Sequence, residues 1–375
     1  MAGIYIHIPF CKKKCHYCNF FSVASVKLKQ GFISALKQEI SLRKEYLAGE
    51  LVETIYFGGG TPSLMNVRDI RCIIDHIKTV FHVNSHAEIS LEANPDDISD
   101  EMLHDLQHSG INRLSLGIQS FFDEDLRYLG RIHTARQAED AINNISTAGF
   151  TNFSIDLIYG VPGQTNENWK RNLEKALEYR IPHISAYALT VEEKTPLHHF
   201  IEEGRCLAPD ENSMISHFDM LRNTLENAGY EHYEISNFCK PGFHSRHNNA
   251  YWEGISYLGL GPSAHSFNGK ARRWNISTIS SYIQGMERGE EKFEEEILSH
   301  EQRYNEYVMT SLRTSQGCNS LKIRDGFGDA FYHHFLSGIQ KPLSQELVYE
   351  SDNLFFLTRK GQIYADRIAS DLFII

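Results

Sequence analysis

Three cysteines lie close together near the start of the sequence, in the segment Cys11-Lys-Lys-Lys-Cys15-His-Tyr-Cys18. Thiolates are the protein ligands of iron–sulfur clusters, and a cubane cluster normally takes four of them. Three cysteines in one loop therefore predict a [4Fe–4S] cluster with one iron free of protein ligands. The amino and carboxylate groups of S-adenosylmethionine (SAM) form a chelate that suits this iron. An electron passed into the SAM sulfonium would then break a C–S bond, which is chemistry of the cofactor rather than of a side chain.

A zinc site completed by His16 or His7 is the alternative reading of the same loop. Zinc motifs usually contain two separated cysteine pairs, and no second pair follows in this sequence. The other four cysteines are isolated from one another, and we interpret them as ordinary thiols: Cys72, Cys206, Cys239 and Cys318.

The composition indicates a globular protein with a substantial core. The chain has 375 residues, of which 41% are hydrophobic and 23% charged, and its formal net charge is −11. This charge argues against nucleic acid or an anionic membrane surface as the main partner. No run approaches the roughly 18 apolar residues that cross a bilayer, and no basic segment precedes an apolar one at the N-terminus. We expect a cytoplasmic protein, with peripheral membrane association as an additional expectation.

Apolar runs alternate with amphipathic segments over the first half of the chain. Strands are predicted at Ile4–Ile8, Thr54–Phe57, Glu88–Glu92, Arg113–Ile118, Phe153–Tyr159 and His183–Leu189, and helices at Lys27–Leu47, Val67–Phe81, Asp100–Ser109, Thr134–Ala148 and Asn166–Tyr179. This alternation indicates repeated βαβ units with a parallel sheet. Six units are too few to close an eight-stranded barrel, so the prediction is an α/β fold with a partial (β/α)6 TIM-type barrel.

The pattern changes after Thr190, where a loop containing Pro196 and Pro209 precedes a helix near Glu211–Ala228. Residues 290–296 are strongly acidic and are interpreted as a solvated connector or a helix start. Further helices, a hairpin (Leu347–Glu350 and Leu354–Leu357) and a last helix at Arg359–Leu372 resemble a winged-helix module. The expected domains are a barrel (1–200), a linking extension (201–295) and a mostly helical C-terminal domain (296–375).

Each predicted strand ends in residues that suit a binding rim rather than simple packing. The second strand runs into Gly58-Gly59-Gly60-Thr61, where the backbone can approach a ligand closely. The fifth strand carries Asp156 inside an apolar run, and a buried carboxylate needs a polar or cationic partner. In βα barrels the site forms at the C-terminal edge of the strands, so these ends are expected to meet there.

Several motifs together resemble the radical SAM superfamily, and specifically the oxygen-independent coproporphyrinogen III oxidase group with its haem-chaperone branch, HemW. The resemblance covers essentially the whole chain. It rests on Tyr5-Ile-His-Ile-Pro-Phe-Cys11, Gly58-Gly-Gly-Thr-Pro62, Leu91-Glu92, Gly117-Ile-Gln119-Ser-Phe121, Asp156-Leu-Ile-Tyr-Gly160-Val-Pro162 and Leu258-Gly-Leu-Gly-Pro-Ser-Ala264. It implies a radical SAM core, with a C-terminal helical domain.

The resemblance implies roles for individual residues. Cys11, Cys15 and Cys18 would ligate the [4Fe–4S] cluster. A larger set would form the SAM site: Tyr5, Tyr17, Gly58, Gly59, Gly60, Thr61, Glu92, Gln119, Arg131, Asp156 and Ala188. Arg131 would pair with the SAM carboxylate, because a guanidinium can bind a carboxylate through two nitrogens. No catalytic side chain is assigned.

Two features separate the oxidase branch from the chaperone branch. The oxidases carry a fourth cysteine two residues after the third, and this sequence has Phe20 there. The segment His247-Asn-Asn-Ala-Tyr251-Trp252 resembles the His-Asn-x-x-Tyr-Trp motif of the chaperone branch. A neutral imidazole is a good ligand for haem iron, and aromatic rings can stack on a porphyrin. The haem-binding candidates are therefore His247, Tyr251, Trp252 and His265, although His247 alone would read as a packed histidine.

The expected function is a haem chaperone of radical SAM fold, with haem as its cargo and a [4Fe–4S] cluster and SAM as its cofactors. The alternatives are oxygen-independent conversion of coproporphyrinogen III to protoporphyrinogen IX, or radical SAM catalysis on another substrate. Expected partners are haem or porphyrin, recipient membrane haem proteins, an electron donor and a second copy of the chain, but no nucleic acid.

Overall fold

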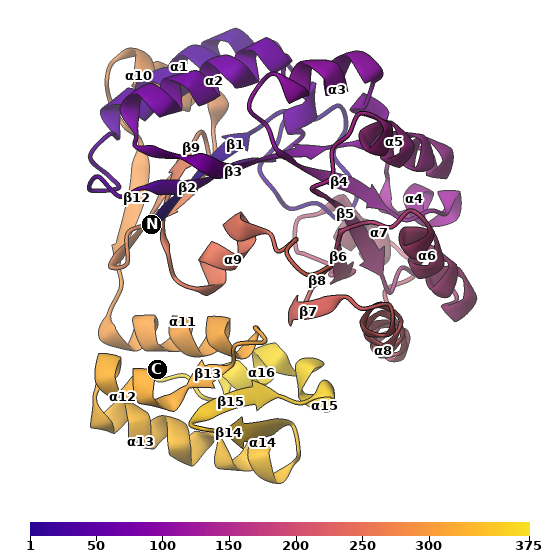
Figure 1. The fold of residues 1–375 in the computed structure, drawn as a ribbon, viewed down its shortest axis with the longest axis vertical. Coiled ribbons are helices and arrows are strands. Elements are labelled where there is room, and N and C mark those ends of the chain that lie inside the picture. The colour runs from indigo at the N-terminus through magenta and orange to yellow at the C-terminus, as the bar shows by residue number, and fades with distance from the viewer.

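A curved, mostly parallel sheet forms the larger part of the molecule (Figure 1). The computed structural model describes residues 1–375. The parallel strands are hydrogen-bonded in the order β9-β1-β2-β3-β4-β5-β6. Their bounds are β1 Ala2–Ile8, β2 Val52–Gly59, β3 Val83–Ala93, β4 Arg113–Gln119, β5 Phe153–Tyr159, β6 His183–Ala188 and β9 Ser256–Leu260. The sheet does not close, which confirms the predicted partial barrel.

Helices cover the outer face of this sheet, and polar and aromatic side chains line its inner face. Side chains alternate along a strand, so Ile4 and Ile6 of β1 pack outward while Tyr5 and His7 point inward. The outer face joins one hydrophobic core of 57 buried residues. The helices that pack on this core are α1 Lys29–Leu42, α2 Val67–Val80, α3 Asp100–Gln107, α5 Ala135–Thr147, α6 Asn166–Glu178 and α8 Glu211–Asn227, whereas α4 Asp123–Leu129 and α7 Pro196–Glu202 pack in a separate small cluster.

Antiparallel strands extend both ends of the parallel sheet. Beyond β6 lie β8 (Asn237–Cys239) and β7 (Glu231–Glu234), and beyond β9 lie β10 (His265–Phe267), β11 (Ala271–Asn275) and β12 (Phe293–Ile297). The remaining elements of this region are α9 (Arg246–Trp252), α10 (Ile279–Glu287) and the 3-10 turns η1 (Pro62–Leu64) and η2 (Pro95–Asp97). These additions complete a 12-stranded sheet.

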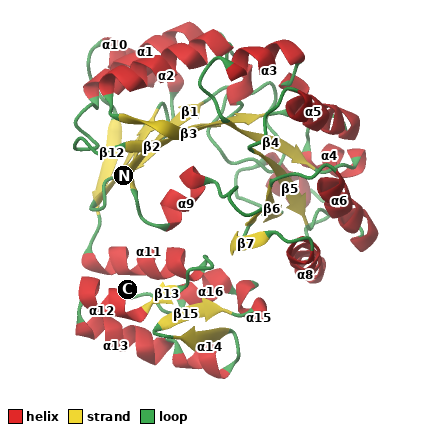
Figure 2. Ribbon diagram, in the orientation of Figure 1, coloured by secondary structure: helices red, strands yellow, loops and turns green.

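The C-terminal part has its own small sheet (Figure 2). It also has its own core of 14 buried residues. Its antiparallel strands are β13 (Cys318–Asn319), β14 (Val348–Ser351) and β15 (Leu354–Leu357), in the order β13-β15-β14. Its helices are α11 His300–Leu312, α12 Ser320–Phe327, α13 Asp329–Gly338, α14 Gln340–Ser344, α15 Arg359–Gln362 and α16 Ala365–Ser370. None of the helices in the structure combines the length and apolar character that crossing a bilayer requires.

Three local predictions from sequence are wrong. The acidic segment contains strand β12, because the arginines of β11 lie opposite its glutamates and offset their charge. The last helix is divided into α15 and α16, because the backbone departs from helical geometry at Tyr364 (ψ 20°). Pro196 does not lie in a loop but is the first residue of α7, and the first position of a helix is the one that best tolerates a proline.

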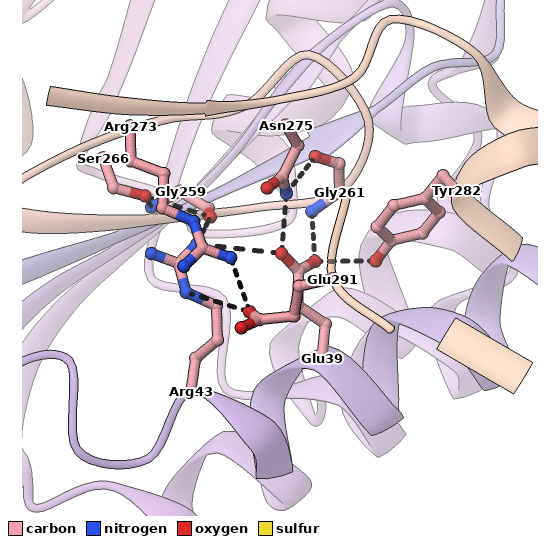
Figure 3. Close-up of polar contacts among 9 residues, drawn as sticks. All are labelled: Glu39, Arg43, Gly259, Gly261, Ser266, Arg273, Asn275, Tyr282 and Glu291. Carbon is pink, nitrogen blue, oxygen red and sulfur yellow. Dashed lines mark hydrogen bonds and ion pairs between the residues drawn. The ribbon is translucent and has the colours of Figure 1, made fainter. Parts of the chain in front are cut away.

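A buried polar network fastens α1 to the added strands (Figure 3). The Glu39 carboxylate accepts hydrogen bonds from the Gly261 N–H (2.8 Å), the Asn275 amide (2.6 Å) and the Tyr282 hydroxyl (2.7 Å). Arg43, one helical turn further along α1, lies 3.8 Å from the same carboxylate. Since every oxygen of Glu39 is occupied, the network holds the β9 end of the barrel in register with its first helix.

Candidate functional site

A cavity of about 870 Å³ opens at the C-terminal edge of the parallel strands. Its walls come from the cysteine loop, the strand ends, α8 and the turn between α15 and α16. Most of the predicted cluster and SAM residues line it: Cys11, Cys15, Tyr17, Cys18, Gly59, Gly60, Thr61, Glu92, Gln119, Arg131, Asp156 and Ala188. The prediction that the strand ends meet at one rim is therefore confirmed.

The cysteine loop is anchored at both ends, so that its three thiols point into one cavity. The Cys11 N–H donates to the Val23 carbonyl oxygen (3.1 Å), which pins the two ends of the loop together. The Thr61 hydroxyl lies 3.4 Å from the Cys11 sulfur, and no disulfide engages any of the three cysteines. Burial raises the pKa of the Cys18 thiol.

The glycines after β2 leave room for this loop. A Cβ atom at Gly60 would lie 2.6 Å from the Phe10 carbonyl oxygen and 3.1 Å from the Cys11 sulfur. Gly59 has a positive φ of 108°, which side-chain-bearing residues rarely adopt. A larger residue at position 60 would therefore push the cysteine loop away from the sheet, and one at position 59 would collide with the His7 ring.

Two carboxyl groups face the cavity from β3 and β5, the two strands on either side of β4. Glu92 accepts from the Tyr56 hydroxyl (2.8 Å) and from the Gly59 N–H (3.2 Å). Burial raises the pKa of Glu92 to about 7, and the charge of Asp156 adds to the rise. Burial likewise raises the pKa of Asp156 to about 6, and Ser115 lies 3.5 Å from it. A cationic ligand would offset the cost of ionising both groups.

Arg131 connects three parts of the rim. Its guanidinium donates to the Asn94 side chain (2.6 Å) and the Gly117 carbonyl oxygen (2.7 Å), and it lies 3.4 Å from the Cys15 sulfur. Gln119 sits beside it with a positive φ of 63°. A Cβ atom at Gly117 would lie 2.9 Å from the Gln119 amide nitrogen, so the glycine makes space for that side chain.

The residues of this cavity fit an iron–sulfur cluster and SAM. Three unpaired thiols converge on one space, and the donor set is the one that iron–sulfur clusters use. The buried Nε of Arg131 has no hydrogen-bond partner, which leaves one donor free for an anionic group such as a carboxylate. The Glu92 and Asp156 carboxyls supply the opposite charge for a sulfonium or an amine.

Two predicted SAM residues do not line the cavity but lie in the layer beneath it. The Tyr5 hydroxyl is bonded to the His7 ring (3.1 Å). A Cβ atom at Gly58 would lie 2.9 Å from the Tyr56 ring and 3.0 Å from Glu92. Tyr5 and Gly58 therefore support the residues that reach the cavity.

The structure does not bring the haem-binding candidates into the cavity. The His247 ring is buried, and both of its nitrogens are occupied, one by the Thr54 hydroxyl (2.7 Å) and the other by the Tyr251 hydroxyl (3.0 Å). Trp252 follows on the same helix, and its indole N–H is buried without a partner. His265 is exposed on β10, apart from this group.

Sequence reasoning missed the part of the cavity that comes from distant elements. Met214 and Phe218 of α8 and Arg313, Tyr364 and Arg367 of the C-terminal part line the same space. Nothing in their local sequence marks them, because they reach the cavity only through the docking of the C-terminal part against β7 and α8. The Ile235 N–H donates to the Arg313 carbonyl oxygen across that junction (3.1 Å).

Comparisons with known proteins agree with this geometry. The family model of the radical SAM superfamily matches residues 5–187. The chain is 34% identical to heme chaperone HemW of Lactococcus lactis, over 95% of this chain and 93% of that protein. It is 32% identical to heme chaperone HemW of Bacillus subtilis, over 98% of both chains.

A solved structure has the same architecture over nearly the whole chain. The Escherichia coli coproporphyrinogen III oxidase HemN, described as a radical SAM enzyme, matches with a TM-score of 0.85 and 25% identity, over 99% of this chain and 90% of that one. The parallel barrel, the three-cysteine loop at its rim and the full-length similarity to two HemW proteins lead to one conclusion. This chain belongs to the radical SAM superfamily and, within it, to the HemW family.

Proposed function

We propose that this protein is a haem chaperone. It carries a [4Fe–4S] cluster and SAM, binds haem as its cargo and passes the haem to membrane haem proteins. The observation that carries the proposal is Phe20. It occupies the position where the oxidases of the wider group have a fourth cysteine, and its side chain is 62% exposed at the cavity wall. Full-length similarity to proteins named heme chaperone supports the same function.

The proposed cofactor ligands are Cys11, Cys15 and Cys18 for the cluster, with Glu92 and Arg131 for SAM. When bound, the cluster and SAM supply one-electron chemistry at the sulfonium. The chain itself orients two of the three thiols, that of Cys11 through the Thr61 hydroxyl and that of Cys15 through the Arg131 guanidinium. It also presents carboxylates to the cationic part of SAM and a guanidinium to the anionic part.

His265 is the proposed ligand for haem iron. Its imidazole is exposed, whereas binding of iron to His247 would break two buried hydrogen bonds. Partial burial and the charge of Arg272 lower the pKa of His265, which favours the neutral ring that binds iron. The Trp274 ring stacks on it, with 5.8 Å between centroids, and offers an apolar surface for a porphyrin.

A haem titration tests this assignment. His265→Ala should weaken haem binding, whereas His333→Ala should not. His333 is a suitable control because it is also exposed and also neighbours an aromatic ring, that of Tyr332. Equal haem affinity in the wild type and His265→Ala would reject His265 and return attention to the α9 motif.

The second candidate function is oxidative decarboxylation of coproporphyrinogen III. It is favoured by the structural match to HemN, which extends over the cavity and the C-terminal part. The two functions are separated by incubating the anaerobically reconstituted protein with SAM, a reductant and coproporphyrinogen III. No product, together with saturable haem binding and SAM cleavage, is expected of the chaperone. Formation of protoporphyrinogen would establish the oxidase instead.

A further inference from the structure

Glu231, Cys239 and His244 bring a carboxylate, a thiol and an imidazole together outside the cavity. One oxygen, the sulfur and one ring nitrogen all lie within 4.8 Å of one another. The His244 Nε2 and a Glu231 oxygen are 3.4 Å apart. The three side chains come from β7, from β8 and from the segment before α9, so this is a convergence of separate segments rather than neighbours along one helix.

The backbone explains why they converge. Glu231 and Cys239 are directly opposite each other on the antiparallel pair β7–β8, so their side chains share one face of the sheet. After β8 the Phe243 N–H donates to the Lys240 carbonyl oxygen (3.0 Å), which closes a turn and carries His244 back over the hairpin. The His244 ring packs on Tyr233, with 4.6 Å between centroids.

We propose that these three residues form a zinc site, with its fourth position open to water. Thiolate, imidazole and carboxylate are the ligand types that zinc takes, and three protein ligands with one open position are typical of non-structural sites. Tetrahedral zinc with bonds of about 2.0–2.3 Å would place its ligand atoms roughly 3.3–3.7 Å apart, and the His244–Glu231 separation lies in that range. Magnesium and calcium are disfavoured because they prefer oxygen ligands alone.

The surroundings of the thiol fit this site. Cys239 is fully buried and has no second cysteine beside it for a disulfide. Burial and the Glu231 charge raise the pKa of the thiol to about 12, so a metal would displace its proton. Arg113 is the cation that faces the sulfur, and its charge favours the thiolate.

A fourth side chain beside the proposed site, His183, independently supports metal binding there. His183 on β6 lies directly opposite Cys239 on its other side, and its buried Nδ1 has no hydrogen-bond partner. Burial lowers the pKa of His183 well below its usual value, so the ring is neutral and adds no positive charge that would oppose a metal ion beside it. Haem iron has only two axial positions left for side chains, on opposite faces of the porphyrin, so these three converging side chains cannot all bind one haem iron. The site is therefore distinct from the proposed haem site.

The test is a zinc titration of the cluster-loaded protein in competition with a chromophoric chelator, under anaerobic conditions. The wild type should bind one zinc ion, and His244→Gln and Glu231→Gln should each weaken binding by about tenfold or more, because loss of a mere supporting contact already has that effect. Both side chains are partly exposed, so neither change should unfold the protein. Cys239→Ser should also weaken binding, and Cys72→Ser, at an exposed cysteine on α2, should not.

A second group of potential metal ligands, on α7, could bind the zinc ion instead. His198, His199 and Glu202 on α7 also lie within ligand distance of one another. Loss of zinc in His199→Gln, with full binding in His244→Gln, would overturn the proposal and place the ion on α7. Zinc binding to the wild type should also release protons, since the thiol must ionise, and binding without proton release would reject Cys239 as a ligand.

Discussion

The imidazole of His247 stacks on the ring of Tyr56, with 4.9 Å between centroids and 17° between planes. The Tyr56 hydroxyl in turn donates a hydrogen bond to Glu92 at the floor of the cavity. The histidine of the α9 motif therefore lies one aromatic ring away from a carboxyl proposed to bind SAM. Through this contact the motif supports the floor of the cavity, separately from any contact with haem.

Replacing His247 by alanine should destabilise the protein and weaken SAM binding, with little effect on haem affinity. The change empties a buried site and leaves the hydroxyls of Thr54 and Tyr251 without their partner, at a cost of roughly 3–4 kcal/mol. Urea denaturation and SAM titration of the cluster-loaded protein measure the two effects. A variant that loses haem affinity but keeps its stability and SAM affinity would show that His247 binds haem directly.

In the ligand-free protein, the stability of Glu92→Gln relative to the wild type should increase as the pH rises. Because the folded-state pKa of Glu92 is raised to about 7, its contribution to stability is present at low pH and is lost as the pH rises through 7. The difference from an unfolded carboxyl corresponds to about 3–4 kcal/mol. The unfolding free energies of variant and wild type should therefore diverge between about pH 5 and about pH 8.

Glu45→Gln is the control for this pH series, because the Glu45 side chain is 85% exposed and should show no such trend. A constant difference between Glu92→Gln and wild type across the series would mean that Glu92 does not titrate in this range. SAM should bind more weakly to Glu92→Gln, since the glutamine offers no negative charge to the sulfonium or the amine.

The sequence predicts those parts of the structure that depend on local patterns. The six strands of the first half of the chain were located to within two residues at every end except the start of β3, which lies five residues earlier than predicted, at Val83. Strand β9 was missed, although it pairs with β1 along the whole of Ser256–Leu260. Its partner lies about 250 residues away, and no local pattern shows that such a strand joins the barrel.

The residues of the site likewise fall into those that a sequence pattern predicts and those that only the fold brings together. Cys11, Cys15 and Cys18 are identified by their spacing alone, and Asp156 by its place in an apolar strand. Arg131 follows only from the family resemblance, because it reaches the rim from the loop after α4 by bonds to Asn94 and Gly117. Arg313 lines the cavity only because the C-terminal part docks against the barrel, and no spacing of residues in the sequence predicts that docking.

Arg131→Ala should weaken SAM binding by about tenfold or more, because hydrogen bonds to charged groups contribute about 1.5–3 kcal/mol. The three cysteines remain, so the iron content after anaerobic reconstitution should be unchanged. Isothermal titration with SAM and iron analysis measure the two quantities. Arg136→Ala is the control, since that side chain on α5 is 90% exposed. Unchanged SAM affinity in Arg131→Ala would limit this arginine to supporting Asn94.

Glu39→Ala should be among the most destabilising single changes in the barrel. It removes the acceptor for Gly261, Asn275 and Tyr282 at once and leaves Arg43 with only the less buried Glu291 (3.7 Å) as its counter-charge, at a cost of about 3–5 kcal/mol. Urea denaturation followed by far-ultraviolet circular dichroism measures the loss, with Glu45→Ala as the matched control at an exposed glutamate. Glu39→Gln should fall between the two, because its amide retains one acceptor oxygen. If Glu39→Ala proves no less stable than Glu45→Ala, the strands beyond β9 must be held to the barrel by their backbone pairing alone.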